Sequence, residues 1–181
     1  MLWQAFYRSA AMGILSDQYQ MLSRLSSQRV RNASRVLYSY YRSKRSGKAV
    51  HQGLPISIAF EPTTSCNLRC PECPSGLRSF TRPTGMLSQN LYQKVIDELA
   101  ETLMYLTFYF QGEPYLHPQF LEMVTYAAER GIYTATSTNA HYLNEQNAEK
   151  TVQSGLNRLI ISIDGSTQER YEAYRIGGKL E

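Results

Sequence analysis

All three cysteines of this 181-residue chain, Cys66, Cys70 and Cys73, fall in one short segment with the spacing Cys-x3-Cys-x2-Cys. Soft thiolates gathered in a closely spaced run are the ligand set of iron-sulfur clusters. Four protein thiolates would saturate a cubane cluster, whereas three leave one iron without a protein ligand. The segment therefore predicts a cluster that keeps one coordination position open for another molecule.

We expect the cysteine segment to be a loop. In a helix, Cys66, Cys70 and Cys73 would share one face. However, Pro71 and Pro74 disfavour the α conformation of the residues before them and remove two backbone donors. The segment should therefore curl in irregular backbone, as a chain does around a compact inorganic core.

Two other interpretations of these residues stay open. The sequence Cys70-Pro71-Glu72-Cys73 alone is a Cys-x-x-Cys motif, typical of a thiol-disulfide oxidoreductase, although Cys66 would then have no role. A zinc-stabilised binding module would need a fourth ligand, and the available histidines, none at zinc-finger spacing, are His51, His117 and His141. The spacing and the lack of other cysteines favour the cluster over both.

After residue 53, strand-like and helix-like patterns alternate with short joints between them. The strand patterns cover residues 56–60, 104–110, 132–138 and 156–163, and the helix patterns cover residues 88–101, 118–130, 144–154 and 166–174. Such alternation is typical of right-handed βαβ units and a parallel sheet. Because the cysteines directly follow the first strand, they should lie at the carboxyl end of the sheet, where α/β folds place their active sites.

The cysteine spacing after a strand, together with the polar ends of the later strands, resembles the radical S-adenosylmethionine superfamily. The resemblance implies that Cys66, Cys70 and Cys73 hold a [4Fe-4S] cluster, whose fourth iron is chelated by the amino and carboxylate groups of S-adenosylmethionine. It also implies one-electron cleavage of that cofactor to methionine and a 5'-deoxyadenosyl radical, which abstracts hydrogen from an unknown substrate. An electron donor such as flavodoxin or ferredoxin would be a partner.

The same resemblance implies which residues bind the cofactor. Gln111-Gly112-Glu113-Pro114 is similar to the family's Gly-Gly-Glu-Pro element, which receives the methionine amino group. The remaining cofactor-binding residues implied at strand ends are Thr138 and Asn139 near the ribose, Ser162 and Asp164 at the end of the fourth strand, and Arg175 for the cofactor carboxylate. Each is an ordinary loop residue when taken alone, and their succession behind the cysteines favours a site.

The chain departs from the family pattern at two positions. Gln111 replaces the first glycine of the Gly-Gly-Glu-Pro element, which could change how closely the backbone approaches the cofactor. Glu72 stands next to the last cysteine, where the family usually has an aromatic residue near the adenine. We therefore expect cofactor binding to be kept and the stacking surface to differ.

The resemblance implies a partial (β/α) barrel of TIM-like type with an N-terminal helical extension, in an α/β fold. Residues 1–53 would be the basic helical extension and linker, and residues 54–181 the radical S-adenosylmethionine core. The family's usual core has about six strand-helix units, and the four seen here leave an apolar edge strand, so we expect the front part of a longer protein. The chain resembles the peptide-modifying members of the family, many of which carry a further cysteine-rich domain, called SPASM, after the barrel.

The first 50 residues look helical and basic. Nine basic residues stand there against Asp17 alone, whereas the remainder carries 10 basic and 14 acidic residues. An apolar stripe recurs at helical spacing and comprises Met12, Leu15, Tyr19, Leu22, Leu25, Val30, Leu37, Tyr38 and Tyr41. We expect this stripe to pack on the outside of the domain, in preference to contact with a membrane or nucleic acid. Clustered free cysteines fit the cytoplasm, because it is a reducing compartment.

Overall fold

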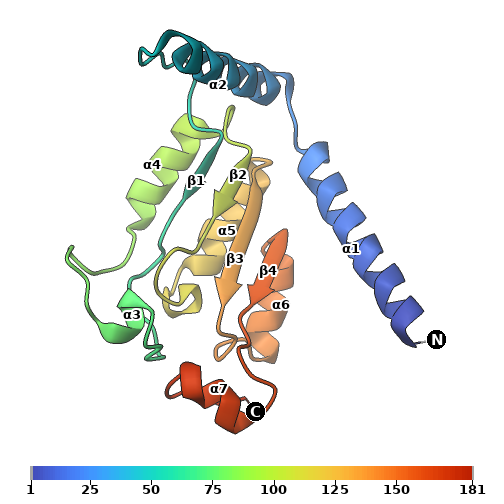
Figure 1. Ribbon diagram of the computed structural model, residues 1–181, viewed down its shortest axis with the longest axis vertical. Coiled ribbons are helices and arrows are strands. Elements are labelled where there is room, and N and C mark those ends of the chain that lie inside the picture. The colour runs from blue at the N-terminus through green and yellow to red at the C-terminus, as the bar shows by residue number, and fades with distance from the viewer. Residues whose placement is uncertain (1, 181) are drawn as a thin grey trace.

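Four parallel strands form one sheet at the centre of the molecule (Figure 1). The computed structural model describes the backbone of residues 2–180 and the side chains of residues 13–180. The strands, in the spatial order β1-β2-β3-β4, are β1 (Ser57–Ala59), β2 (Tyr105–Thr107), β3 (Tyr133–Thr138) and β4 (Arg158–Ile161). Each strand pairs in parallel with its neighbour in sequence. The predicted α/β class and parallel sheet are confirmed.

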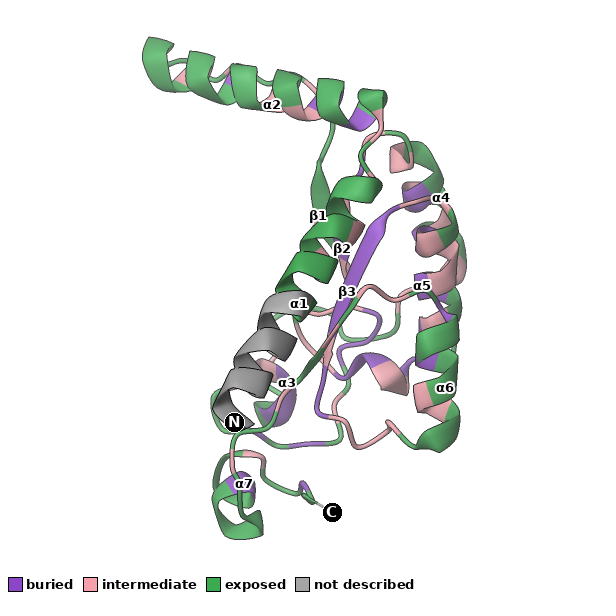
Figure 2. Ribbon diagram, turned by 90° about the vertical axis from the view of Figure 1, so that its right-hand side faces the viewer, coloured by how far each residue is buried: buried purple, intermediate pink, exposed green. Residues whose placement is uncertain are grey.

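Three helices cover one side of this sheet, as Figure 2 shows. They are α4 (Gln89–Leu99), α5 (Phe120–Glu129) and α6 (Glu145–Gln153). The caps follow the sequence signals, since the Ser88 side chain accepts a hydrogen bond from the Leu91 amide and the Asn144 side chain accepts one from the Asn147 amide. Short helices complete the connections: α3 (Pro74–Leu77), the 3-10 turn η1 (Pro114–Leu116) and α7 (Gln168–Tyr174).

The hydrophobic core lies between the sheet and these helices. Its fully buried members include Tyr92 and Ile96 of α4, Leu106 of β2, and Phe120 and Met123 of α5. Tyr92 keeps its hydroxyl satisfied inside the core by donating to the Met123 carbonyl at 2.6 Å. This core holds the strands in place and so fixes where the strand ends lie.

Two N-terminal helices, α1 (Leu2–Ser23) and α2 (Ser27–Ser46), contact the domain through polar side chains. On α1, Gln20 accepts from Asn157 at 2.9 Å and Asp17 pairs with Arg158. Arg29 of α2 is 5% exposed and donates to the carbonyls of Arg24 and Gly131 at 2.6 Å and to those of Ala100 and Arg130 at 2.9 Å. Three of these carbonyls lie at the C-terminal ends of α4 and α5, where backbone acceptors have no helical partner. One arginine therefore joins α2 to two helices of the domain.

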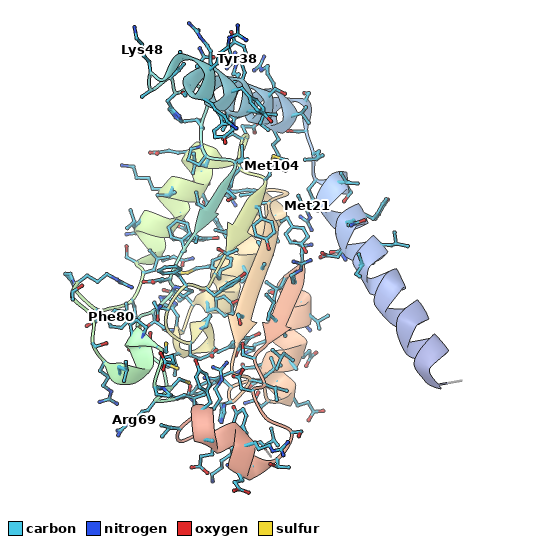
Figure 3. The ribbon with its side chains drawn as sticks, in the orientation of Figure 1. Met21, Tyr38, Lys48, Arg69, Phe80 and Met104 are labelled. Carbon is cyan, nitrogen blue, oxygen red and sulfur yellow. The ribbon has the colours of Figure 1, made fainter. Side chains whose placement is uncertain are left out.

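The prediction that the N-terminal apolar stripe packs on the domain is wrong for the described side chains. Leu15, Tyr19 and Leu22 are 64%, 72% and 63% exposed, and the rest of the stripe is exposed too, namely Leu25, Val30, Leu37, Tyr38 and Tyr41. Met12 lies outside the residues whose side chains are described. The stripe points outward because Arg29 and Asn32 satisfy backbone groups of the domain, so α2 turns its polar side inward. Figure 3 shows Tyr38 on α2, and Lys48 just after it, pointing away from the sheet.

Neither long helix is a membrane span. None of the helices in the described part of the chain is long and apolar enough to cross a bilayer. In Figure 1, α2 lies across the end of the molecule where β1 and β2 begin, opposite the end where the strands finish.

Candidate functional site

The cysteine loop follows β1 and is pinned at both of its ends. The Thr64 amide donates to the Gly85 carbonyl at 3.0 Å, and the Gly85 amide returns a bond to the Thr64 hydroxyl at 2.9 Å. Within the loop, Cys66 to Cys73 form no regular helix, as predicted, and α3 begins directly after them. Gly76 of α3 packs so closely on the loop that a Cβ there would lie 2.5 Å from the Cys70 nitrogen and oxygen. The loop is therefore a tightly folded unit.

The three cysteines line one cavity of about 250 Å³ together with residues from the other strand ends. The sequence-predicted residues that the structure brings into this cavity are Gly112, Glu113, Thr138, Asn139, Ser162 and Arg175. Two others lie outside its lining. Pro114 is buried as the first residue of η1, and Asp164 forms an ion pair with Arg175. The ion pair with Asp164 thus fixes the position of the Arg175 guanidinium at the cavity.

Each cysteine sulfur has a polar side chain beside it, and each of these comes from a different part of the chain. The sulfur of Cys66 lies 3.9 Å from Nδ2 of Asn139, which follows β3. The sulfur of Cys70 lies 3.9 Å from Nη1 of Arg175, at the end of α7. The sulfur of Cys73 lies 3.3 Å from Oε1 of Gln111, after β2. The cysteine loop is therefore tied to three other elements through its sulfurs.

Glu113 is the buried carboxylate of the site, only 2% exposed. It accepts hydrogen bonds from the Thr138 hydroxyl at 2.7 Å, the Asn139 amide at 2.9 Å and the Tyr115 amide at 3.3 Å. Burial raises the pKa of Glu113 above its ordinary value, while these hydrogen bonds oppose the rise. The carboxylate is held in one orientation and can receive an ammonium group at its remaining lone pairs.

Gly112 allows the backbone before Glu113 to pass against the cysteine loop. Its φ is +79°, and a Cβ at this position would lie 1.9 Å from the Thr63 carbonyl oxygen. The Glu113 amide beside it donates to the Ser65 carbonyl at 2.8 Å. A side chain at this position would be strained by this conformation and would clash with the Thr63 carbonyl.

The sequence interpretation missed several residues of the cavity. Ser137 faces it from β3, where its hydroxyl lies 3.1 Å from that of Ser162. Phe110, which is 75% exposed, borders the cavity at the end of β2. The others are Leu68, Ser75, Gly76, Tyr109 and Tyr174. Tyr109 and Phe110 could have been found, because they directly precede the Gln111 to Pro114 element.

The donor set fits an iron-sulfur cluster better than a single ion. Across the described residues, no three side chains of His, Cys, Asp or Glu come together closely enough to hold one metal ion. A cubane cluster does not need such convergence, since each thiolate binds a different iron and the ligands stand further apart. Three cysteines around one cavity, one of them buried and two half-buried, meet that requirement.

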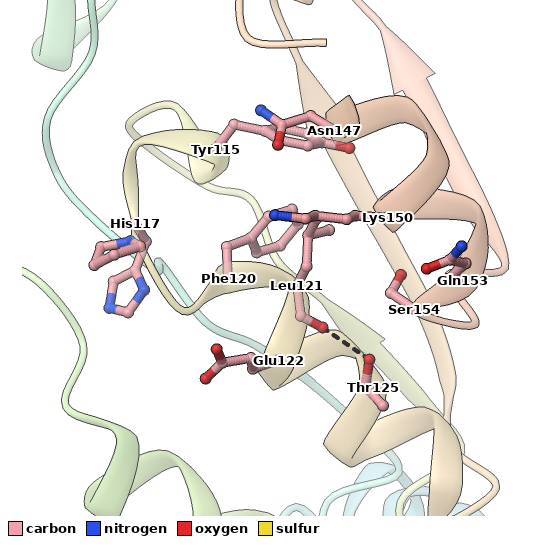
Figure 4. A pocket seen from close by; sticks show the side chains of 11 residues that line it. Tyr115, His117, Phe120, Leu121, Glu122, Thr125, Asn147, Lys150, Gln153 and Ser154 are labelled. Carbon is pink, nitrogen blue, oxygen red and sulfur yellow. Dashed lines mark hydrogen bonds between the residues drawn. The ribbon is translucent and has the colours of Figure 1, made fainter. Parts of the chain in front are cut away.

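A second hollow, of about 400 Å³, lies between η1, α5 and α6 on the helical side of the sheet (Figure 4). Several of its polar groups are already engaged. His117 interacts through Nε2 with the Leu87 carbonyl at 3.0 Å and accepts at Nδ1 from the Gln119 amide at 3.1 Å, and the Tyr115 hydroxyl bonds that of Thr151 at 2.7 Å. His117 is thus a structural residue, and the cysteine cavity is the better candidate.

Comparison with known proteins identifies the family. The model of the radical SAM superfamily, named for S-adenosylmethionine, matches residues 60–181. The chain belongs to the radical SAM superfamily. An AdoMet-dependent heme synthase from Methanosarcina barkeri is 32% identical over 67% of this chain and 34% of its own length. A PqqA peptide cyclase from Rhodopseudomonas palustris is 32% identical over 70% of this chain and 33% of its own length.

A solved structure supports the fold. The crystal structure of BtrN in complex with AdoMet and 2-DOIA matches with a TM-score of 0.57 and 21% identity, covering 71% of this chain and 54% of that one. The predicted family and the predicted partial TIM-like barrel are confirmed, and the enzyme names of the relatives support the prediction of an enzyme. It spans about a third of the length of the two curated relatives.

Proposed function

We propose that this chain holds a [4Fe-4S] cluster on Cys66, Cys70 and Cys73 and binds S-adenosylmethionine beside it. The observation that carries the proposal is that the three cysteines and the buried carboxylate of Glu113 line one cavity. When bound, the cluster would supply the electron that cleaves the cofactor and so initiates hydrogen abstraction from substrate. The remaining residues of the cavity bind, orient and shield the cofactor.

The polar groups of the cavity suit the parts of a zwitterionic nucleoside. The Glu113 carboxylate, oriented by Thr138 and Asn139, would accept hydrogen bonds from the methionine ammonium. Arg175, held by Asp164, would bind the methionine carboxylate. The Ser162 hydroxyl, now 3.1 Å from that of Ser137, and the Asn139 side-chain amide, which now donates to Asn67 at 2.8 Å, would exchange these partners for the carboxylate and the ribose.

We further propose that the substrate is a peptide or protein, that the electron donor is a flavodoxin or ferredoxin, and that the enzyme works in the cytoplasm. One relative is by name a peptide cyclase, which supports a peptide substrate. Another is by name a heme synthase, so the substrate class has to be tested with both kinds of compound. Free cysteines in the cavity support a reducing compartment.

Anaerobic reconstitution with iron and sulfide tests the cofactor proposal. The wild-type chain should take up iron and acid-labile sulfide, and after reduction it should release 5'-deoxyadenosine from S-adenosylmethionine. Cys70→Ala should lose both properties, and Cys66→Ala should lose them too. A thiol-disulfide oxidoreductase, which needs only Cys70 and Cys73, would instead keep its activity in Cys66→Ala. Bound zinc without iron would instead identify a zinc-stabilised module and refute the proposal.

A further inference from the structure

We propose that the side-chain amide of Gln111 hydrogen-bonds the sulfur of Cys73 and thereby raises the reduction potential of the cluster. This inference rests on the cluster proposed above. It concerns a residue that stands where the similar family element has glycine, which has no side chain to make such a bond.

The Gln111 side chain already contacts Cys73 in the structure, with the free thiol as the donor. Oε1 of the half-buried Gln111 lies 3.3 Å from the Cys73 sulfur and 3.3 Å from the Ser75 hydroxyl. The Ser75 hydroxyl in turn accepts from the Gly112 amide at 2.8 Å. The Gln111 side chain is thus fixed between the last cysteine and the first residue of α3 that faces the cavity.

The amide can pair with either form of the cysteine. A free thiol donates its proton to Oε1, whereas a thiolate that binds iron can only accept. A half-turn of the amide would exchange Oε1 for Nε2, whose N–H groups would then donate to the Cys73 sulfur and the Ser75 hydroxyl oxygen, while the Ser75 proton that now meets Oε1 would turn away. Both atoms can accept, so the exchange needs no movement of the backbone.

An N–H donor beside a cluster sulfur stabilises the reduced cluster, which carries more negative charge, and so raises its reduction potential. Asn139 and Arg175 lie 3.9 Å from the other two sulfurs, but both are also proposed to bind the cofactor. Gln111 is therefore the position where the effect on the cluster can be measured apart from cofactor binding.

Gln111→Met removes the N–H groups and keeps the length of the side chain, and Gln111→Gly removes the side chain. Gln146→Met, on the exposed side of α6, is the matched control. The midpoint potential of each reconstituted protein is measured by a redox titration followed by electron paramagnetic resonance, without S-adenosylmethionine. We expect both Gln111 variants to have a more negative potential than wild type, and the control to match wild type.

The outcomes separate this inference from the proposed function. If wild type takes up no iron, the proposed function fails and this inference fails with it. If the variants load and keep the wild-type potential, the tuning role alone is refuted. If wild type and Gln146→Met load but neither Gln111 variant does, Gln111 serves cluster assembly, and the tuning role is again refuted.

A separate observation concerns α2, and here we propose that its outer face binds the surface of an anionic lipid bilayer. We define the α2 outer face by its exposed basic residues, Arg31, Arg35, Arg42, Lys44 and Arg45, and its exposed apolar residues, Val30, Leu37, Tyr38 and Tyr41. The helix contains no acidic residue, and none of its basic residues takes part in the ion pairs found among the described residues. Its positive charge is therefore uncompensated.

The composition of the outer face favours a bilayer over a nucleic acid. A phosphate backbone needs only the basic residues, whereas an interfacial helix also inserts an apolar stripe between headgroups. Val30, Leu37, Tyr38 and Tyr41 recur at helical spacing to form that stripe, with 49–59% of each exposed. In Figure 1, α2 lies at the opposite end of the molecule from α3 and α7, whose residues Ser75, Gly76 and Tyr174 line the cysteine cavity, so a membrane-bound chain would keep the cavity open to solution.

Co-sedimentation of the chain with vesicles tests this surface. Vesicles containing phosphatidylserine should bind the chain, vesicles of phosphatidylcholine alone should not, and added salt should release it. The double variant Arg31→Gln, Arg35→Gln should bind about 25-fold more weakly at low salt, at about fivefold per charge. The control Lys94→Gln, Lys150→Gln removes the same charge from other exposed helix positions and should bind like wild type.

A second pair of substitutions distinguishes the bilayer from nucleic acid. Leu37→Ser with Tyr41→Ser keeps every charge and should still weaken vesicle binding. Failure of wild type to sediment with the anionic vesicles would refute the proposal. The proposal would also be refuted if the Leu37→Ser, Tyr41→Ser variant bound vesicles as wild type does and the arginines were needed instead for binding to RNA or DNA oligonucleotides.

Discussion

Replacing Gly76 by alanine should dislodge the cysteine loop while leaving the sheet intact. The added Cβ would lie 2.5 Å from the nitrogen and the oxygen of Cys70 and 3.0 Å from the carbonyl carbon of Arg69. Ordinary contacts of a Cβ begin at 3.4 Å, so the Cys70 backbone must move by about 1 Å. All three neighbouring atoms are backbone, which cannot swing aside as a flexible side chain would.

We estimate the cost of this displacement as about 1–3 kcal/mol, the usual range for overpacking. In the metal-free protein this should lower the melting temperature by about 2–10 °C. The larger effect should be on the cluster, since moving one ligand by about 1 Å should weaken metal retention roughly 10- to 100-fold. Iron and acid-labile sulfide per chain, measured after anaerobic reconstitution and gel filtration, report that loss.

Gly85→Ala is the matched control for this experiment. Gly85 closes the same loop, but a Cβ there would meet nothing within 4 Å. Gly85→Ala should therefore load iron and sulfide as wild type does. If Gly76→Ala retains the wild-type iron content and visible spectrum, the tight packing of α3 on Cys70 does not position the cluster ligand, and the reasoning fails.

Three further substitutions have defined outcomes. Glu113→Gln should weaken binding of S-adenosylmethionine to the reconstituted protein about 10-fold or more. A charge-assisted hydrogen bond is lost, and the new amide nitrogen faces the Asn139 or Tyr115 N–H. Equilibrium dialysis measures the affinity, and an unchanged affinity contradicts the prediction. Burial raises the pKa of Glu113. As the pH falls, binding of S-adenosylmethionine to the wild type should therefore weaken at a higher pH than it would with a glutamate of ordinary pKa. Arg29→Met should lower the free energy of unfolding, measured by urea titration, by about 2–4 kcal/mol, since four backbone carbonyls lose a charged donor. The control Arg31→Met, at an exposed position on the same helix, should change the free energy of unfolding by about 0.5 kcal/mol or less. Gly112→Ala should prevent accumulation of folded chain, because its Cβ would overlap the Thr63 carbonyl oxygen at 1.9 Å; a wild-type circular dichroism spectrum and melting curve would refute that.

The order of strands and helices could be predicted from sequence because each element carries its own signals. Ser88 and Asn144, residue types favoured at helix N-termini, stand at the start of two of the predicted helix patterns, and both cap helices in the structure. The orientation of the N-terminal helices could not be predicted in this way. An apolar stripe indicates which face of a helix would prefer burial, but Arg29 and Asn32 bind backbone groups that only the folded domain brings together.

The cysteine ligands could be identified locally, whereas their neighbours could not. The side chains beside the sulfurs of Cys66, Cys70 and Cys73 are 73, 105 and 38 residues away along the chain. No short-range pattern relates positions so far apart. What relates them is the parallel order β1-β2-β3-β4, because every strand of such a sheet ends at the same edge.

The same topology explains why Gln111 could be noted as a departure from the family element but not understood from sequence alone. Taken as a replacement for glycine, it suggested only a change in how closely the backbone approaches the cofactor. Yet Gly112, the next residue, already provides the close approach, with its φ of +79° and its contact with Thr63. The residue before it is free to carry a side chain, and this side chain meets Cys73 because β1 and β2 pair in parallel and so bring the loops that follow them together. A position released from one constraint can therefore acquire a second role, which is why we look to Gln111 for a property of the cluster.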